Sequence, residues 1–219
     1  MYAQLPMSFW TVSRANQPSC GRWISAIAAA LIVAVCGRAT SVVPPSFDEL
    51  VNESDYIVRA VTKSVVAEWR TMPSGKRMIY SKVELEVRET IAGKPPSPLV
   101  LEVIGGVVEG RELAISGAPK FVVGEEAILF VQGNHRQIFP LVRIMHGQYP
   151  IRRDPVAGRE YVARSNGEPL RDVRAVSRAM HGTGGVAASP QEAARPPMSP
   201  ADFVQSIRAT AVRPHLLER

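Results

Sequence analysis

The alternation of apolar and polar positions changes three times along the chain. A continuous apolar run near the N-terminus is followed by short segments that alternate with period two, then by a stretch without periodicity, and last by a one-sided apolar stripe. Period two is typical of half-buried β-strands, and a stripe repeating every three to four residues indicates a helix. The pattern therefore predicts a mostly β domain between a leader and a tail.

The predicted domain begins with a short helix and a long strand. Ser46, followed three residues later by Glu49, has the spacing of a capping box, which predicts a helix over residues 47–54. Residues 56–69 are rich in β-branched side chains, so they predict a long strand directly after this helix.

The clearest alternation lies in residues 78–91. Val83, Leu85 and Val87 share one face, and charged residues occupy the positions between them. Such a strand covers a core with one face and meets solvent with the other. Further strands are predicted over residues 99–106, 112–116, 127–131, 137–144, 148–153 and 159–165. These short strands with regular turns indicate an all-β fold, either a small barrel or a sandwich.

Two adjacent glutamates raise the question of catalysis. Glu125 and Glu126 follow Gly124 and precede the apolar run 127–131. Neighbouring side chains of a strand point to opposite faces, so the two carboxylates do not converge on one substrate atom. We interpret Gly124 as a turn residue with positive φ and both carboxylates as solvated by water. The run is then a central strand that is buried on both faces.

The tail of the chain carries a second predicted helix. Residues 171–199 are rich in Ala, Gly, Pro and Arg without periodicity, which predicts a flexible linker. Ser199 as N-cap and Pro200 at the first helical position predict a short helix over residues 200–210. This helix is expected to dock on the domain or on a partner. Residues 44–170 are expected to form the β-barrel domain itself.

Residues 1–39 are predicted to be a secretory signal peptide. Basic residues precede the apolar run 23–35, whose 13 residues are too few for a membrane span of about 20. Cleavage is expected after Ala39, with a cut after Cys36 as the alternative, and the bulky residue before Cys36 argues against a lipoprotein. Translation from Met7 is a further alternative, because the stretch before the run is long. The protein is therefore expected to be periplasmic or extracellular.

Export changes the cysteine content and the charge. The only cysteines, Cys20 and Cys36, leave with the signal peptide, so the mature chain is expected to lack disulfides and thiolates. Three arginines leave too, and the net charge falls from +6 to +3. Residues 40–170 hold 16 basic and 16 acidic residues, so the excess of seven basic over four acidic residues lies in residues 171–219. A neutral domain argues against nucleic-acid binding, and no membrane span is expected in the mature protein.

Four segments together resemble a known type of domain. The succession of "FDELVNESDYIVRAVTKSV", "VELEVRETIAGK", "VLEVIGG" and "FVVGEEAILFV" resembles the OB-fold barrels of the netrin-like and metalloproteinase-inhibitor type. It resembles more closely exported bacterial β-barrel domains of similar pattern. The resemblance covers residues 46–164 and implies an OB-like barrel. Netrin-like families usually carry disulfides and an N-terminal cysteine that reaches a protease metal. The mature chain is expected to have neither, so no inhibitory residue is carried over.

The sequence contains no motif of metal or nucleophilic catalysis. His135 and His146, the histidines of the domain, lack the spacing of a metal site, and we interpret them as surface or turn residues. Neither a G-x-S-x-G motif nor a phosphate-binding glycine loop occurs. No catalytic residue, metal or cofactor is therefore predicted.

The best candidate for a binding surface consists of Arg143, Tyr149, Arg152 and Arg153. If the hairpin brings Arg143 beside Arg153, the two guanidinium groups would bind a carboxylate or an anionic polymer. The alternative is a solvated polar face that Glu160 neutralises from the opposite strand.

These features favour an exported, non-catalytic module that binds a protein or another macromolecule. The alternatives are a secreted hydrolase, whose site is not apparent in the sequence, and a structural envelope protein. Convergent polar side chains with shifted pKa values would favour the hydrolase. An apolar groove or an exposed sheet edge would favour binding.

Overall fold

The computed structural model describes residues 43–180 and 194–212. The expected signal peptide, both cysteines and residues 181–193 of the expected linker lie outside this part of the chain. No helix within the described residues is long and apolar enough to cross a membrane.

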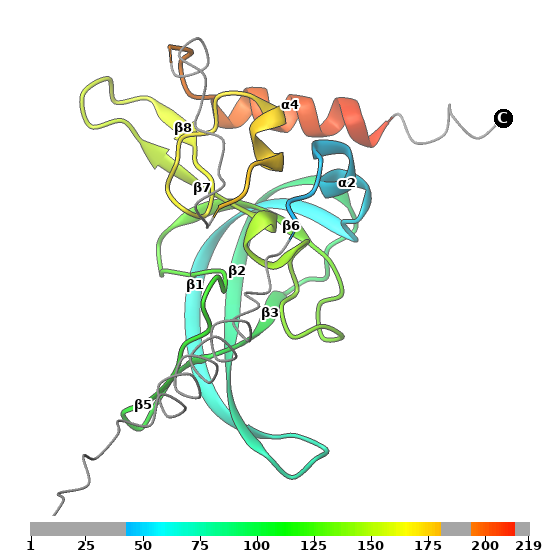
Figure 1. Ribbon diagram of the computed structural model, residues 1–219, viewed down its shortest axis with the longest axis vertical. Helices are drawn as coiled ribbons and strands as arrows, with labels where there is room; N and C mark the ends of the chain where they lie inside the picture. Colours follow the sequence, from blue (N-terminus) through cyan, green and yellow to red (C-terminus); the bar gives the residue numbers. More distant parts are fainter. Residues whose placement is uncertain (1–42, 181–193, 213–219) are drawn as a thin grey trace, which may run out of the picture. The chain divides into compact units, whose positions relative to one another are not determined.

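One antiparallel sheet of six strands dominates the fold, which confirms the expected mostly β character (Figure 1). Its strand order is β3–β2–β1–β6–β7–β8. The two long strands, β1 and β2, pair along nearly their whole length, with three register shifts that mark irregularities or bulges. The bounds are β1 (Tyr56–Thr71), β2 (Arg77–Gly93), β3 (Leu99–Ile104), β6 (Glu126–Val131), β7 (Gln148–Arg153) and β8 (Glu160–Val162).

The sheet is open, because β3 and β8 each pair with only one strand. Of the two expected alternatives, a barrel or a sandwich, the described residues do not form a closed barrel. In place of a closing strand, the loop after β6 covers the outer edge of β3. The Nδ2 of Asn134 donates to the carbonyl of Val100 at 2.8 Å, and the amide of Ile104 donates to the carbonyl of Ile138 at 3.3 Å. These bonds satisfy edge groups that would otherwise be available to another chain.

A separate two-stranded sheet follows β3. It consists of β4 (Gly106–Val108) and β5 (Arg111–Leu113). The turn between them places Glu109 and Gly110 at φ 51° and 74°, which is the backbone of a tight two-residue hairpin. The strand expected over residues 112–116 is therefore real, but it ends at Leu113.

The strand expected over residues 137–144 is wrong. Only an isolated bridge joins Leu141 to Val131, and the chain then turns through Arg143 and Ile144, whose φ angles are 47° and 61°. A short 3-10 helix, η1 (Ile144–Gly147), follows. The apolar residues of this segment are buried in the core, but they reach it from a loop. Their spacing in the sequence resembles that of a strand, which is why a strand was expected.

Strand β6 separates two apolar clusters. Ile128 and Phe130 face the first cluster, which includes residues of the helices, β7 and β8. Ala127, Leu129 and Val131 face the second cluster, which includes residues of β1, β2 and β3. All five side chains are buried, so the predicted central strand with two buried faces is confirmed.

The N-terminal helix α2 (Phe47–Asn52) forms at the predicted place. Ser46 Oγ accepts a hydrogen bond from the Glu49 amide at 3.2 Å, and the Glu49 carboxylate accepts one from the Ser46 amide at 2.7 Å. This is the predicted capping box. The helix buries Leu50 and Val51 in the first cluster.

The predicted C-terminal helix is confirmed as α4 (Pro200–Ala211), and it docks on the domain beside α2 (Figure 1). Ser199 Oγ caps it by accepting from the Asp202 amide at 3.1 Å. Phe203 and Ile207 are fully buried in the first cluster. The helix is therefore part of the core.

The expected linker begins with folded residues. A second 3-10 helix, η2 (Val173–Ser177), buries Ala175 and Val176 in the first cluster. At the other end of the expected linker, the Met198 amide donates to the carbonyl of Leu170 at 2.7 Å. Residues on both sides of the undescribed stretch 181–193 thus pack against the sheet.

Candidate functional site

The arginines of the predicted binding surface are already paired with acidic residues. Arg143 lies in the loop before η1, where its Nη2 is 2.6 Å from an oxygen of Glu53. Arg153 lies at the end of β7, 3.5 Å from Glu160 on β8, as the alternative interpretation expected. Arg143 is therefore not on the hairpin, and each of the two guanidinium groups is engaged by a different glutamate.

Tyr149 lies in the interior of the domain. Its side chain is fully buried, and its ring packs against Phe203 and Phe130 at centroid distances of 5.0 and 5.5 Å. Burial raises the pKa of the Tyr149 hydroxyl well above its ordinary value. The side chain is thus a neutral core residue and does not reach a ligand at the surface.

The adjacent glutamates each bind a different arginine. Glu125 is 2.6 Å from Arg152, and Glu126 is 2.6 Å from Arg59. The expectation that water alone solvates the two carboxylates is therefore wrong. Their separate partners agree with the expectation that the two carboxylates do not converge on one substrate atom. Gly124 has a φ of 86°, so the predicted positive-φ turn before β6 is confirmed.

The two histidines of the domain have different environments. His135 is exposed, and its Nδ1 lies 3.5 Å from Glu102. His146 is buried in η1, so its interpretation as a surface residue is wrong. Within the described residues no group of three or more His, Cys, Asp and Glu side chains is arranged to hold a metal ion.

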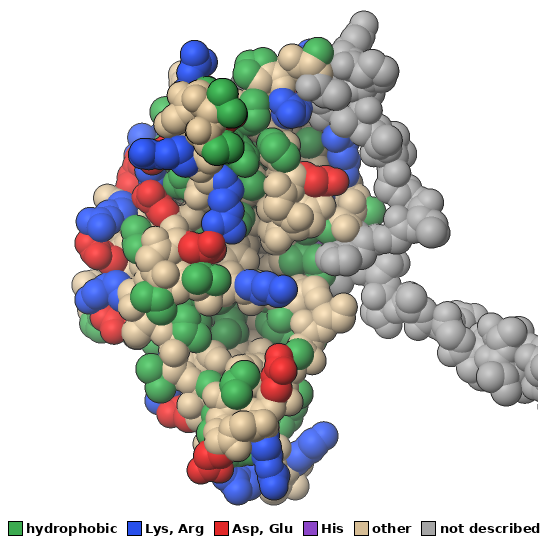
Figure 2. All heavy atoms as spheres, turned by 90° about the vertical axis from the view of Figure 1, so that its left-hand side faces the viewer, with side chains coloured by type: hydrophobic (Ala, Val, Ile, Leu, Met, Phe, Trp, Pro, Cys, Tyr) green, Lys and Arg blue, Asp and Glu red, His purple; other side chains and the backbone are tan. Residues whose placement is uncertain are grey.

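Basic and acidic side chains are interspersed over the described part of the face in Figure 2. Pairs of opposite charge also connect strands of the sheet. Arg70 is 2.7 Å from Glu102, and Lys63 is 3.2 Å from Glu84. Such pairs neutralise each other locally.

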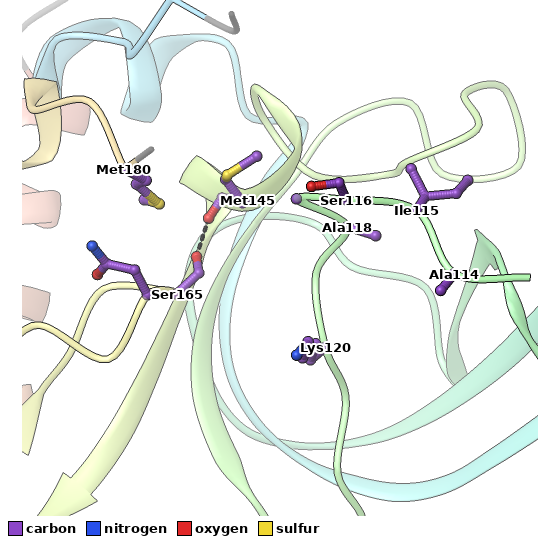
Figure 3. A pocket seen from close by; sticks show the side chains of 10 residues that line it. Ala114, Ile115, Ser116, Ala118, Lys120, Met145, Ser165 and Met180 are labelled. Atoms are coloured by element: carbon purple, nitrogen blue, oxygen red, sulfur yellow. Dashed lines mark hydrogen bonds between the residues drawn. The ribbon is translucent and has the colours of Figure 1, made fainter. Parts of the chain in front are cut away.

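A pocket of about 750 Å³ opens beside η1 (Figure 3). Four parts of the chain form it: the segment after β5, η1, the turn that follows β8, and the residues that follow η2. We call it the Lys120 pocket. Its lining consists of Ala114, Ile115, Ser116, Gly117, Ala118, Lys120, Met145, Ser165, Asn166 and Met180.

Two side chains hold the walls of the Lys120 pocket together. The buried Gln148 donates from Nε2 to the carbonyl of Lys120 at 2.6 Å, which ties the segment after β5 to β7. Ser165 Oγ donates to the carbonyl of Met145, as the dashed line in Figure 3 shows, and lies 3.0 Å from the carbonyl of Gln148. The backbone of the pocket is therefore positioned by the sheet.

Arg164 fixes the third wall. Its side chain is buried, and its guanidinium binds Glu168 at 3.1 Å and donates to the carbonyl of Arg178. These contacts connect the turn that carries Asn166 with the residues just before Met180. A charged group that is desolvated in this way holds its partners in one geometry.

The chemistry of the Lys120 pocket suits binding better than proton transfer. Ser116, Asn166 and Lys120 supply polar groups, and Met145 and Met180 supply apolar contact. The lining has no carboxylate, imidazole or thiol. A serine nucleophile needs a base within hydrogen-bond reach, and among the described residues Lys120 makes no hydrogen bond to Ser116 or Ser165.

A second pocket of about 580 Å³ lies between the end of β2 and the start of β3. Prolines and aliphatic side chains dominate its lining, and Lys94 is its charged residue. Its polar side chains are Thr90, Lys94 and Ser97, and it is smaller than the Lys120 pocket, which is therefore the better candidate.

Sequence reasoning missed the Lys120 pocket. Its residues come from four separated segments that share no motif, and only the folded sheet brings them together. Comparison with known proteins adds no further assignment: no protein-family model matches the chain, and no curated protein matches it in sequence.

Proposed function

We propose that the protein is an exported, non-catalytic module that binds a protein or another macromolecule through the Lys120 pocket. The observation that carries the proposal is the composition of this pocket, which combines hydrogen-bond donors with methionine side chains on a fixed backbone. Its volume of about 750 Å³ is within the range of pockets that enclose a ligand group.

Two further observations support binding over hydrolysis. The lining has no carboxylate, imidazole or thiol, and Lys120 is its one ionisable side chain, so an acid–base pair would need a second residue from elsewhere. Charged side chains such as Arg152 and Arg143 are engaged by carboxylates, so recognition is expected at the pocket and not on a charged face. The export part of the proposal depends on the leader sequence alone. The resemblance to metalloproteinase-inhibitor-type domains also favours a protein partner.

The test is affinity capture from the envelope fraction with a variant that fills the pocket. Ser116 is exposed and lines the pocket, so Ser116→Trp should block entry with little cost to folding. Val156→Trp is the matched control, because Val156 is 95 % exposed on the loop between β7 and β8. We expect the wild type and Val156→Trp to retain the same partners and Ser116→Trp to lose them.

Retention of every partner by a folded Ser116→Trp variant would contradict the proposal. Hydrolysis of an ester or peptide by the wild type would instead support the alternative of a secreted hydrolase. Thermal melting of both variants shows whether the fold is intact.

A further inference from the structure

Lys120 brings an uncompensated positive charge to the pocket. It is the one charged residue of the lining, and within the described part of the chain its ammonium group has no hydrogen bond or ion pair. The acidic residue nearest in sequence to Asn166, Glu168, is already paired with Arg164 at 3.1 Å. An ammonium without a counter-ion beside a partly enclosed space favours an anionic ligand.

The other polar groups of the pocket are also donors. The Oδ1 of Asn166 accepts a hydrogen bond from the Glu168 amide at 3.2 Å, which leaves the Nδ2 of Asn166 to donate elsewhere. The hydroxyl of Ser116 is exposed at the pocket and has no partner among the described residues. A lysine, an amide nitrogen and a hydroxyl match a ligand group that only accepts, and an ionised carboxylate is such a group.

The other residues of the lining favour a ligand in which the carboxylate is attached to an apolar group. Figure 3 shows Met145 and Met180 near Ser165, with Ile115 on the segment after β5. Methionine side chains adapt to irregular apolar shapes and contact them favourably. A small inorganic anion would leave these surfaces in water, whereas an aliphatic group would cover them.

We propose that the Lys120 pocket binds a carboxylate carried on an apolar group. Lys120, Asn166 and Ser116 hold the carboxylate, and Met145 and Met180 contact the apolar part. The carboxylate is either the C-terminus of a peptide or that of a free aliphatic acid. This inference rests on the proposed function, because it names the ligand chemistry of the same pocket.

The experiment titrates the full chain with two matched pairs of probes by calorimetry. One pair is hexanoate and hexanamide, and the other is N-acetyl-leucyl-methionine and its C-terminal amide. We expect at least one acid to bind about tenfold more tightly than its amide, because the charge-assisted contact to Lys120 is lost in the amide. The pair that shows this preference identifies the source of the carboxylate.

Variants then assign the preference to the pocket. Lys120→Met should abolish the difference between acid and amide, and Lys120→Arg should retain it. Lys76→Met is the matched control, since Lys76 is an exposed lysine in the turn between β1 and β2. Equal binding of acid and amide by the wild type, or an undiminished preference in Lys120→Met, would overturn the inference.

The two proposals fail separately. If neither acid binds but macromolecular capture remains sensitive to Ser116→Trp, the ligand class is wrong and the binding function stands. If an acid binds through Lys120 but capture is insensitive to Ser116→Trp, the ligand class stands and the macromolecular function is wrong.

Discussion

Gly124 adopts a backbone conformation with positive φ, which is unfavourable for residues that have a Cβ atom. Its φ is 86° at the turn into β6, and a Cβ atom built there would meet no other atom within 4 Å. The cost of a substitution is therefore backbone strain alone, without a steric clash.

Gly124→Val should accordingly destabilise the protein by about 1–3 kcal/mol. Gly124→Asn should cost less, because asparagine tolerates positive φ. Urea unfolding of the two variants beside the wild type measures both effects. Equal stability of all three proteins would show that the turn relaxes to another conformation.

The ionisation of Glu102 on β3 makes the stability of the fold depend on pH. Hydrogen bonds from Arg70, at 2.7 and 2.9 Å, are the largest cause that lowers the pKa of Glu102 below its ordinary value of 4.5. Because the folded-state pKa is the lower one, the carboxylate stabilises the fold above the unfolded-state pKa. This contribution is lost as the pH falls through the folded-state pKa.

Glu102→Gln should therefore lose less stability than the wild type between about pH 5 and about pH 2. The measurement is the urea midpoint as a function of pH. Glu112→Gln is the control, since Glu112 is an exposed residue of β5 that has no ion pair with any other described residue. Parallel profiles for Glu102→Gln and the wild type would contradict the prediction.

At the scale of elements, α4 is a structural part of the domain. The ring of Phe203 lies 5.0 Å from that of Tyr149 and 6.0 Å from that of Phe130, between centroids, and its side chain is fully buried. Removal of such a ring leaves a cavity and loses apolar burial.

Phe203→Ala should therefore cost about 3–5 kcal/mol in the free energy of unfolding. Gln205→Ala changes an exposed position of the same helix and should stay within about half a kcal/mol. Urea unfolding compares the two variants. If Phe203→Ala unfolded like Gln205→Ala, α4 would be an appendage and not part of the core.

Elements with local signals were predictable. The capping box at Ser46 and the Ser199–Pro200 pair each depend on contacts within a few residues, so the sequence alone locates both helices. Residues 137–144 were not predictable in this way. Leu141 and Val142 are buried as an apolar strand residue would be, but they reach the core from a loop. The pattern of apolar residues indicates burial, and burial is common to strands and to loops that pack on the core.

At the scale of the whole molecule, export remains a prediction from the leader. The mature protein should begin between about Gly37 and Val42, because the basic flank, the short apolar run and the small residues after it form a signal peptide. Mass spectrometry of the protein recovered from the envelope or the medium measures this. An intact N-terminus or a lipid on Cys36 would contradict it.

The sequence by itself determined which segments are apolar on one face or on both, and where the local caps and turns lie. It therefore predicted α2, α4, the turn at Gly124 and the central strand β6. These features depend on neighbours in the chain or on period alone.

Only the tertiary structure decided which distant residues meet. It buried Tyr149, paired Glu125 with Arg152 and left the sheet open with a loop over β3. It also assembled the Lys120 pocket from segments far apart in the chain. The physical reason is that strand order and loop path follow from the packing of whole faces against each other, which no local pattern of apolar and polar residues records.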